Sequence, residues 1–479
     1  MNLDCLLDGV AVVRREGRGN PEITEISIDS RRARRGSLFC CFQGLRADSH
    51  NYALEAAGNG AAAFLCERTL TDIPKNIPQI IVKDARAAMA LCSGAFFDNP
   101  ARGLTLIGVT GTNGKTTTTH MIKAIGEAWG KRVGLIGTNY ILIDKLMIEA
   151  HATTPDPFEL HSLFRRMADA GMQWVVMEVS AHALWLRKLC GLVFDVGVFT
   201  NFSQDHLNDF GTMEAYFEAK ARLFKPDACK SAVLFLDDPQ IGGLKTSVSH
   251  TSFGFEEGAD VRAVEVRQSP GGSGFRLETA QGSADIKVAI PGYFTALNAA
   301  AAGGAALALG IPLPVIRCGL ERMPGVPGRM ETVPSKDGAT YIVDYACTPD
   351  ALVNALKAAR GFTSGRLCVV FGCGGDRDAA KRPLMGCVAS ELADMCIVTS
   401  DNPRTEDPER IIDAIVAGMK GPAEIRREPD RAAALKAAVE WAGEGDVVLV
   451  EGKGNENYQD IGGVKLPFSD REVLERLIH

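Results

Sequence analysis

Long apolar runs are missing from this 479-residue sequence. No uninterrupted apolar stretch reaches the ~20 residues that a membrane-spanning helix needs, so we expect no membrane span. Residues 1–20 carry Asp4 and Asp8 within a broken apolar pattern, and we expect no signal peptide there. An excess of basic residues is missing too, because 52 Lys and Arg oppose 59 Asp and Glu, for a net charge of −7. This balance argues against non-specific binding to nucleic acid or anionic membranes.

Ordered cysteine and histidine patterns are also missing. The 13 cysteines are scattered, with no repeated CxxC and no paired His ligands. One interpretation is a metal or disulfide framework, and the other is a set of small buried thiols in a reducing compartment. We favour the second interpretation, and it predicts a cytoplasmic location.

The composition is that of an ordinary globular protein, with 46% hydrophobic and 23% charged residues. The length corresponds to about three domains of common size. Turn-rich stretches, "FFDNPARGLT" (96–105) and "MPGVPGRMETVP" (323–334), suggest the boundaries. We therefore predict three α/β domains, at 1–98, 99–328 and 329–479.

Strands and helices alternate along the second and third predicted domains. "LTLIGVTG", "KRVGLIGT", "WVVMEVS", "DVGVFTNFS" and "SAVLFLDD" are strand candidates in the second domain. A helix after the first of these places Met121, Ile122, Ile125 and Trp129 on one face and stops at Gly130. In the third domain "TYIVDYA", "LCVVFGCGG", "MCIVTSDNP" and "DVVLVEGKG" are strands that end in polar loops. This alternation predicts mostly parallel sheets, with ligands outside the carboxyl ends of the strands.

The segment "VTGTNGKTTTTH" (109–120) lies between a strand and a helix and is rich in glycine. Gly111, Gly114 and Lys115 offer backbone N–H groups, a helix N-terminus and a positive charge to a phosphate group. The Thr116 hydroxyl suits Mg²⁺. Val109 stands where the common phosphate loop has its first glycine, so the sequence indicates a shorter variant of that loop.

Polar residues follow two further strands of the second domain. Glu178 ends one strand, and Asn201, Asp205 and His206 follow another. If both strands end at the edge that carries the glycine loop, Glu178 and His206 can hold Mg²⁺. Lys220 lies on a helical pattern, where the residue pattern alone indicates a solvated surface lysine.

Arginine and amide-bearing residues follow two strands of the third domain. "GCGGDRDAAKRP" contains Arg377, and "SDNPRTEDP" contains Asp401, Asn402 and Arg404. Guanidinium groups suit a carboxylate, while Asp and Asn suit an ammonium group, so one interpretation is an amino-acid pocket. The other is an ion-paired loop that caps the next helix. The residues alone leave both open.

The order of these motifs resembles the Mur ligases, and among them the diaminopimelate-adding members. "TGTNGKTTT", "TTPDP", "MEVSAHAL", "FTNFSQDHL", "PGRME", "DYACTPDAL", "GCGGDRDAAKRP", "SDNPRTEDP" and "EGKGNENYQ" occur in the family's order over nearly the whole chain. The resemblance implies an ATP-dependent acid–amino-acid ligase of peptidoglycan synthesis, and hence of cell-wall biogenesis, cell shape and cell division. It would add meso-diaminopimelate to UDP-MurNAc-L-Ala-D-Glu through an acyl phosphate.

By the same resemblance, domain 1–98 binds the UDP substrate, domain 99–328 resembles a P-loop ATPase and binds ATP, and the Rossmann-like domain 329–479 binds the amino acid. A monomer is implied, with Mg²⁺ as cofactor and Lys220 carbamylated. The implied catalytic residues are Lys115, Lys220 and His206; the metal ligands are Thr116, Glu178, His206 and carbamylated Lys220. The implied ATP-binding residues are Gly111, Thr112, Asn113, Gly114, Lys115, Thr116, Thr117, Asn298, Arg329 and Asp344. Ser30, Thr153, Thr154, Ser180, Arg187 and Lys188 are implied for the UDP substrate, and Arg377, Asp401, Asn402, Arg404, Gly452 and Glu456 for the amino acid.

The sequence departs from the family pattern at several positions near the substrates. Asn455 and Cys347 each stand where the family usually has histidine, and "DHLNDFG" replaces Asp-His-Leu-Asp-Tyr-His-Gly. "AHALWLRK", with Leu186, lacks a usual Gln and Arg pattern that Arg187 or Lys188 can replace. An alternative is therefore a Mur-like ligase that acts on a different carboxylate and amino acid in a secondary pathway. A folylpolyglutamate synthetase fits the "GTNGK" loop but not the "DNPR" segment, and a non-catalytic ATP-binding scaffold fits poorly with Lys115, Glu178, His206 and Lys220 all kept.

Overall fold

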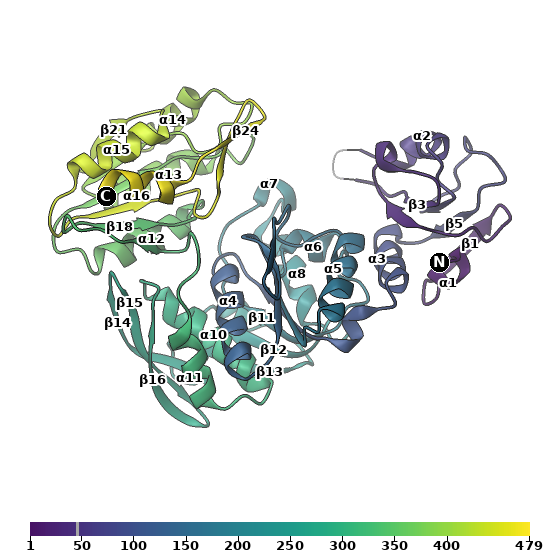
Figure 1. Cartoon of the computed structure of the whole chain (residues 1–479), viewed down its shortest axis with the longest axis horizontal. Coiled ribbons are helices and arrows are strands. Elements are labelled where there is room, and N and C mark those ends of the chain that lie inside the picture. Colours follow the sequence, from purple (N-terminus) through teal and green to yellow (C-terminus); the bar gives the residue numbers. More distant parts are fainter. Residues whose placement is uncertain (45–46) are drawn as a thin grey trace.

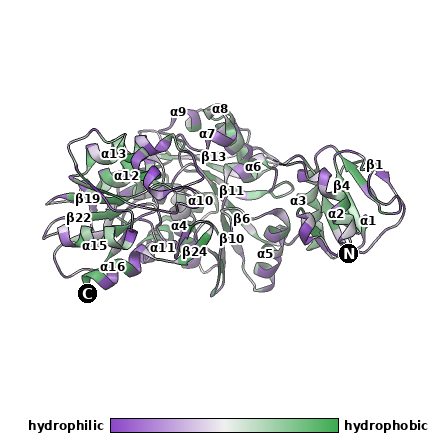
Figure 2. Ribbon diagram, turned by 90° about the horizontal axis from the view of Figure 1, so that it is seen from above, coloured by the Kyte–Doolittle hydropathy of each residue, from purple (hydrophilic) through white to green (hydrophobic). Residues whose placement is uncertain are grey.

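The computed structural model describes residues 1–44 and 47–479. Figure 1 shows three lobes along the chain, with the N-terminal lobe at one end and the C-terminal lobe at the other. Each lobe is built on its own sheet, of five, eleven and six strands. Helices that cover the sheets carry both hydrophilic and hydrophobic residues (Figure 2), as expected for elements with one buried face.

The first sheet has the order β1-β5-β4-β3-β2. Its strands β2 to β5 pair in parallel, and β1 is antiparallel to β5. Helix α3 and the short α1 share one core with this sheet, and α2 shares another. The elements are α1 (Leu3–Leu6), β1 (Val12–Glu16), β2 (Glu25–Ser27), β3 (Ser37–Cys40), α2 (Ala53–Gly58), β4 (Ala63–Cys66), β5 (Gln79–Val82) and α3 (Ala85–Phe96).

The central sheet confirms the predicted parallel strands and extends them at both edges. Strands β7, β10, β6, β11, β12, β13 and β14 pair in parallel in that order. Antiparallel strands β15 and β16 extend one edge, and β8 and β9 extend the other; the sequence did not predict them. The strands are β6 (Thr105–Thr110), β7 (Val133–Ile136), β8 (Ile141–Ile143), β9 (Leu146–Ile148), β10 (Trp174–Glu178), β11 (Phe194–Phe199), β12 (Cys229–Phe235), β13 (Ser249–Gly254), β14 (Val261–Ser269), β15 (Gly272–Thr279) and β16 (Gly282–Val288).

Helices cover both faces of the central sheet. Helix α4 buries Met121, Ile122 and Ile125 as predicted, together with α10 and α11. Trp129 is a correction, because its side chain is 43% exposed. The helix ends at Ala128, so Trp129 occupies the C-cap and leaves the apolar face. The helices are α4 (Lys115–Ala128), α10 (Phe294–Ala308) and α11 (Leu313–Arg322) on this face, and α5 (Pro157–Asp169), α6 (Ala181–Trp185), α7 (Leu207–Phe210), α8 (Met213–Ala221) and α9 (Pro239–Gly242) elsewhere.

The third sheet has the order β17-β18-β22-β19-β20-β21 and is parallel except for β17. Helices α15 and α16 share one core with it, fixed by a fully buried double hydrogen bond from Arg431 to Asp470, each bond 2.7 Å long. The elements are β17 (Glu331–Val333), β18 (Thr340–Val343), α12 (Pro349–Arg360), β19 (Leu367–Phe371), α13 (Lys381–Leu392), β20 (Met395–Val398), α14 (Pro408–Val416), β21 (Glu424–Arg427), α15 (Arg431–Trp441), β22 (Val447–Val450), the hairpin β23 (Tyr458–Ile461) and β24 (Val464–Pro467), and α16 (Asp470–Ile478).

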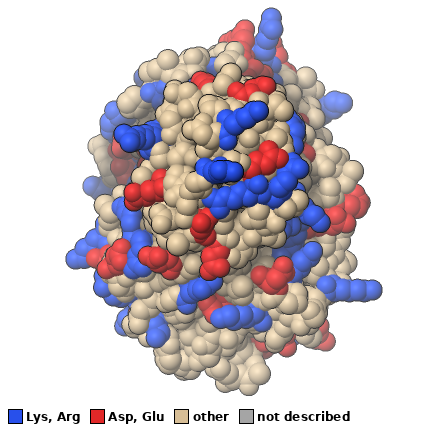
Figure 3. Space-filling view, turned by 90° about the vertical axis from the view of Figure 1, so that its right-hand side faces the viewer, with Lys and Arg blue, Asp and Glu red and all other residues tan. Residues whose placement is uncertain are grey.

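Three features bear on the predicted surroundings of the protein. Within the described residues, no helix is both long and apolar enough to cross a membrane. Basic and acidic side chains are interspersed over the end face of the molecule that Figure 3 shows. Eight of the thirteen cysteines are buried, as the interpretation of core thiols predicted.

Candidate active site

The glycine loop joins β6 to α4 and can be made only with glycine at two positions. Gly111 has φ +149° and Gly114 has φ +81°, in the region that disfavours side chains. A Cβ atom would lie 1.9 Å from Thr200 Oγ1 at Gly111 and 2.4 Å from Asn298 Oδ1 at Gly114. The loop therefore approaches its neighbours closely and leaves the N-terminus of α4 facing outward from the strand end, where it suits an anion.

Two lysines converge on one carbonyl oxygen of this loop. Lys115 Nζ donates to Gly111 O over 2.9 Å and to Thr112 O over 2.8 Å. Lys220 Nζ donates to the same Gly111 O over 2.8 Å and lies 4.5 Å from the centre of the Tyr216 ring. The surface position that the residue pattern alone indicated for Lys220 is wrong, because Lys220 is only 1% exposed.

Burial sets the protonation of both amines. Burial lowers the pKa of Lys220 well below its usual value, and the neighbouring Lys115 lowers it further, against Asp205. Burial also lowers the pKa of Lys115, which Glu178 and Asp205 oppose. Lys220 is therefore readily deprotonated, and a neutral amine is a nucleophile.

Hard oxygen atoms meet at the start of α4. Thr116 Oγ1 donates to Glu178 Oε1 over 3.0 Å, which joins the loop to the end of β10. The backbone N–H and the hydroxyl of Thr138 hold the same carboxylate over 2.8 Å and 3.0 Å. A buried carboxylate beside a hydroxyl is a donor set that Mg²⁺ accepts, so these two residues fit the predicted metal.

His206 lies on a separate hydrogen-bond network from Glu178. It precedes α7 with φ +54°, and its Nε2 atom is 3.3 Å from Asp205 Oδ2. Its Nδ1 atom is 3.9 Å from Asp209 Oδ2. Burial lowers the pKa of His206, and Asp205 opposes this shift. The structure therefore brings Thr116 and Glu178 together directly, and places His206 beside two carboxylates instead.

Residues from the end of the central lobe and the start of the third reach the loop. Arg329 Nη2 donates to Thr116 Oγ1 over 3.0 Å, and its guanidinium stacks 4.5 Å from the Tyr345 ring centre. Asp344 Oδ1 accepts from the backbone of Met330 over 2.8 Å. Burial raises the pKa of Asp344, against the effect of Arg329. Asn298 also reaches the loop, because a Cβ atom at Gly114 would lie 2.4 Å from its Oδ1 atom.

One contact of the loop was missed in the sequence. Asp350, in the first turn of α12, accepts from Asn113 Nδ2 over 3.1 Å and from Ser203 Oγ over 3.0 Å. It thereby ties the third lobe to the glycine loop. An acid in the first turn of a helix is expected from the helix dipole alone, so the sequence held no signal for this role.

The two predicted arginines of the third lobe lie around one glycine. A Cβ atom at Gly374 would be 2.9 Å from Arg404 Nη1 and 3.7 Å from Arg377 Cγ. Arg404 Nη1 also donates to Gly375 O over 2.6 Å. The hairpin β23–β24 holds the Arg404 backbone at φ +50° through hydrogen bonds to Asp460 O and from the N–H of Gly462. The Arg404 guanidinium and the aliphatic stem of Arg377 therefore lie beside a backbone without a side chain, and a guanidinium in such a place suits a carboxylate.

Asn402 anchors a buried polar network next to these arginines. Its Nδ2 donates to Glu456 Oε2 over 2.8 Å, and its Oδ1 accepts from Lys453 Nζ over 3.0 Å. Lys453 also bonds Glu456 over 2.9 Å and is fully buried. Asp401 Oδ1 lies 3.9 Å from Lys453 Nζ. The position of Gly452 leaves no room for a side chain, because a Cβ atom there would lie 2.8 Å from Asp401 Oδ2. Lys453 was not predicted, although a lysine between two glycines after a strand was a visible signal.

The interpretation of an ion-paired, helix-capping loop holds for the second half of "DNPRTEDP", and the amino-acid pocket stays a prediction for its first half. Asp407 caps α14 by accepting from the N–H of Glu409, and Glu406 bonds Arg382 over 2.8 Å. These residues are structural. Asp401, Asn402 and Arg404 instead face the network described above.

Two of the predicted UDP-substrate residues, Arg187 and Lys188, lie where the first and central lobes meet. A cavity of about 370 Å³ is lined by Ile28, Phe42, Gly44, Arg86, Met89, Asp156, Leu186 and Lys188. Lys188 Nζ bonds Asp156 over 2.7 Å, and Arg187 lies 3.4 Å from Asp84.

The remaining residues of this predicted set have structural partners. Thr153 Oγ1 lies 3.0 Å from Thr138 Oγ1, and Thr154 donates to Glu178 O over 2.9 Å. Ser180 accepts from Ala183 and caps α6. Ser30 donates to Glu55 over 2.6 Å and is not among the residues that line the cavity.

Departures from the family pattern have defined places too. Leu186 lines the cavity, and the Cys347 carbonyl accepts from Lys381 Nζ over 2.7 Å. The backbone N of Asn455 would lie 2.1 Å from a Cβ at Gly328, so this segment packs on the connection between the lobes.

A short phosphate loop lies at the carboxyl end of a parallel sheet, and an arginine and a charged pocket from a second α/β lobe lie beside it. This arrangement defines a multidomain nucleotide-using enzyme. The Mur ligase middle domain matches residues 109–306, and the glutamate ligase domain of Mur ligases matches residues 328–454. The chain therefore belongs to the Mur ligase family and is an ATP-dependent acid–amino-acid ligase with ATP as co-substrate.

Named relatives are similar over almost their whole length. The UDP-N-acetylmuramoyl-L-alanyl-D-glutamate–2,6-diaminopimelate ligase of Geobacillus kaustophilus is 46% identical over 475 residues, covering 96% of each chain. The ligase of the same name from Bacillus licheniformis is 43% identical, again over 96% of each chain. A solved structure of a ligase of that name is 34% identical, with a TM-score of 0.69 over 95% of this chain and 94% of the other.

Proposed function

We propose that this ligase joins meso-diaminopimelate to UDP-N-acetylmuramoyl-L-alanyl-D-glutamate in peptidoglycan synthesis, the reaction that its relatives' names state. The observation that carries this proposal is the placement of Arg404 and Arg377 around Gly374, next to the Asn402–Glu456 network. Diaminopimelate has a second carboxylate that lysine lacks, and this is the group that the two guanidiniums would bind.

The reaction proceeds in two steps. The terminal carboxylate of the nucleotide substrate attacks the γ-phosphorus of ATP, the bond to ADP breaks, and an acyl phosphate forms. The amine of the amino acid then attacks the acyl carbon, loses a proton, and expels phosphate to leave an amide. Lys115 and the backbone N–H groups at the start of α4 would stabilise the charge on the transferred phosphoryl group.

Thr116, Glu178, His206 and carbamylated Lys220 are the residues that would hold magnesium. Thr116 and Glu178 support this because their oxygen atoms lie 3.0 Å apart at the loop. When bound, Mg²⁺ neutralises phosphate charge. Gly111, Thr112, Asn113, Gly114, Thr117, Asn298, Arg329 and Asp344 are proposed for the nucleotide around it.

Lys220 is proposed to carry a carbamate. Its buried amine has a lowered pKa, so the neutral form can add to CO₂ and release a proton. The product is a carboxylate-like group beside the loop. A carbamate signal in ¹³C NMR after exposure to ¹³C-bicarbonate would appear in the parent chain and disappear in Lys220→Ala; its absence from the parent would refute the modification.

The cavity between the first and central lobes is proposed to take the uridine nucleotide. Arg187 and Lys188 are bonded there to Asp84 and Asp156 and can exchange these partners for a diphosphate. Ser30, Thr153, Thr154 and Ser180 are proposed to support this region. Domain boundaries at 98/99 and 328/329, a monomeric state and a cytoplasmic location also stay predictions.

The deciding experiment measures phosphate release from ATP with the muramoyl dipeptide nucleotide and either meso-diaminopimelate or lysine. Turnover with the first amino acid, and little with the second, is expected. Omission of the nucleotide substrate is the control. Turnover only with another carboxylic acid would refute the proposal and favour a Mur-like ligase of a secondary pathway.

A further inference from the structure

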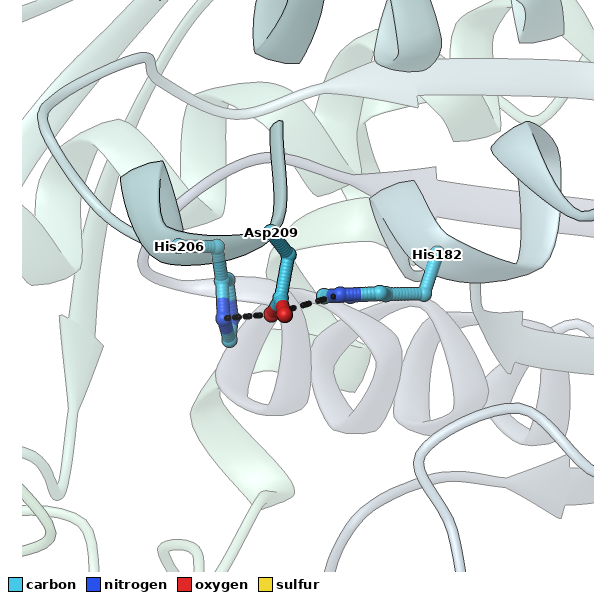
Figure 4. Close-up of side chains that lie close together, drawn as sticks. All are labelled: His182, His206 and Asp209. Atoms are coloured by element: carbon cyan, nitrogen blue, oxygen red, sulfur yellow. Dashed lines mark hydrogen bonds and ion pairs between the residues drawn. The ribbon is translucent and has the colours of Figure 1, made fainter. Parts of the chain in front are cut away.

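Two histidines and an aspartate meet outside the Thr116–Glu178 pair (Figure 4). His182 comes from α6, Asp209 from α7, and His206 directly precedes α7. The Asp209 carboxylate lies between the two rings, with Oδ2 3.0 Å from His182 Nε2 and 3.9 Å from His206 Nδ1. One ligand atom from each residue lies within 4.8 Å of the others.

A neighbouring carboxylate orients one of these rings. While Nδ1 of His206 faces Asp209, its Nε2 is 3.3 Å from Asp205 Oδ2. Histidines that bind a metal through one nitrogen usually donate from the other to a carboxylate, which fixes the ring and raises its basicity. Asp205 is placed to do this for His206.

Aromatic packing orients the other ring. The His182 ring centre is 4.9 Å from that of Phe210 and 6.4 Å from that of Trp185. The two imidazole rings are themselves 4.9 Å apart and nearly perpendicular. The three ligand side chains are therefore held together by packing as well as by the hydrogen bond between His182 and Asp209.

The donor set is that of zinc and its neighbours rather than of magnesium. Mg²⁺ prefers oxygen ligands in octahedral geometry, whereas imidazole suits Zn²⁺, Co²⁺ and Ni²⁺. Tetrahedral Zn²⁺ with bonds of about 2.0–2.2 Å separates its ligands by roughly 3.3 Å. The observed 3.0 Å and 3.9 Å bracket that separation, so small side-chain rotations suffice. Asp209 is exposed, which leaves a fourth position for water.

We propose that His182, His206 and Asp209 form a binding site for one transition-metal ion of the Zn²⁺ class, distinct from the Mg²⁺ position at Thr116 and Glu178. The site shares His206 with the ligase centre. An ion bound there withdraws this imidazole from the ligase centre and inhibits the enzyme. The inhibition rests on the proposed function; the binding does not.

Titration with Co²⁺ in excess Mg²⁺, followed by visible absorption of the tag-free full chain, tests the binding. One equivalent should give a tetrahedral spectrum in the parent chain. Asp209→Asn and His182→Ala should each weaken binding by more than about 100-fold, since loss of an outer partner alone costs about 10–100-fold. His250→Ala, which changes an exposed histidine on β13, is the matched control and should bind normally.

Three outcomes would overturn the site. These are no tetrahedral Co²⁺ in the parent chain, binding by Asp209→Asn and His182→Ala equal to that of the parent, or a charge-transfer band that assigns the ion to cysteine. Far-UV circular dichroism of each variant confirms that it folds, and Asp209→Asn changes an exposed residue on a short helix.

Inhibition is tested separately with Zn²⁺ at saturating Mg²⁺. The parent chain should lose turnover at a Zn²⁺ concentration at least about 10-fold below that needed for Asp209→Asn, in line with the loss of a ligand. Equal inhibition of both would refute the coupling through His206. If the chain proves inactive on the muramoyl nucleotide, the proposed function fails while the Co²⁺ titration still decides the metal site.

Discussion

Single residues of this site place ionisable groups where water is excluded. Lys220 and Lys453 are almost fully buried, and each donates to oxygen atoms of a loop that follows a strand. Glu451 is buried as well, with Oε2 accepting from Ala346 over 3.0 Å and no partner for Oε1 among the described residues. Buried ionisable groups cost stability unless they are paired, so such residues mark positions kept for chemistry or for alignment.

Arg404→Ala tests the specificity of the amino-acid pocket. Loss of a hydrogen bond to a charged group costs about 1.5–3 kcal/mol, or roughly 10- to 150-fold in kcat/KM, with diaminopimelate. With lysine, which has no second carboxylate, kcat/KM should change little. Steady-state kinetics with both amino acids measure this. Equal losses would show that Arg404 does not distinguish them.

Glu451→Gln tests the cost of the buried carboxyl. Burial and the neighbouring Asp344 raise the pKa of Glu451 well above the usual 4.5. The folded chain therefore holds the proton more tightly than the unfolded chain. Stability from this proton is complete below the unfolded pKa and is lost as the pH rises toward the folded pKa.

Glu451→Gln has no carboxyl proton to lose, so it removes this loss of stability at higher pH. Its free energy of unfolding should exceed that of the parent by an amount that grows as the pH rises above the ordinary carboxyl range toward the raised folded pKa of Glu451, at about 1.4 kcal/mol for each pH unit. Urea denaturation at several pH values measures it. Glu444→Gln, at an exposed position, should show no such trend. A constant or shrinking difference for Glu451→Gln would contradict the assignment.

At the scale of elements, the strand β6, the glycine loop and α4 act as one unit. The loop turns sharply because Gly111 and Gly114 have positive φ, and Lys115 begins the helix directly after it. The absence of the common first glycine shortens the loop, and Val109 instead pairs within the sheet between β10 and β11.

Gly111→Ala should abolish ATP binding while the fold remains. The new methyl would lie 1.9 Å from Thr200 Oγ1, so the loop must move. Gly130→Ala is a matched control, because Gly130 also has positive φ, at +77°, but nothing within 4 Å. Both variants should lose about 1–2 kcal/mol of stability from the strained backbone, and only the first should lose nucleotide affinity. Calorimetric titration with ATP distinguishes them, and similar affinities would be contrary to this view.

At the scale of the whole molecule, three α/β lobes meet at two places. The first lobe lines a cavity with the central lobe, and the third lobe contacts the glycine loop, with the first and third lobes on opposite sides of the central lobe in Figure 1. Arg329 and Asp350 both bring the third lobe to the glycine loop. The position of that lobe is therefore set partly by residues that would contact ATP.

Asp350→Ala should loosen this arrangement. The two hydrogen bonds are at the surface, where such contacts are worth about 0–1 kcal/mol, so the fraction of molecules with the third lobe held against the loop should fall by up to about fivefold relative to those with it detached. Small-angle X-ray scattering should give a larger radius of gyration for the variant. Asp227→Ala, at an exposed turn, is the control. An unchanged radius would mean that other contacts fix the lobe.

The sequence by itself determined the α/β lobes, the glycine loop and most polar strand ends. Glycine positions, the periodicity of apolar residues and the order of the motifs along the chain are enough to predict these features. The residue pattern alone did not place Lys220, which only the family resemblance indicated, nor Asp350, whose partner Asn113 lies far away in the chain. It also could not reveal the His182, His206 and Asp209 cluster. Such sites arise where distant strand ends and short helices meet, and only tertiary packing decides which side chains then share a low-dielectric space.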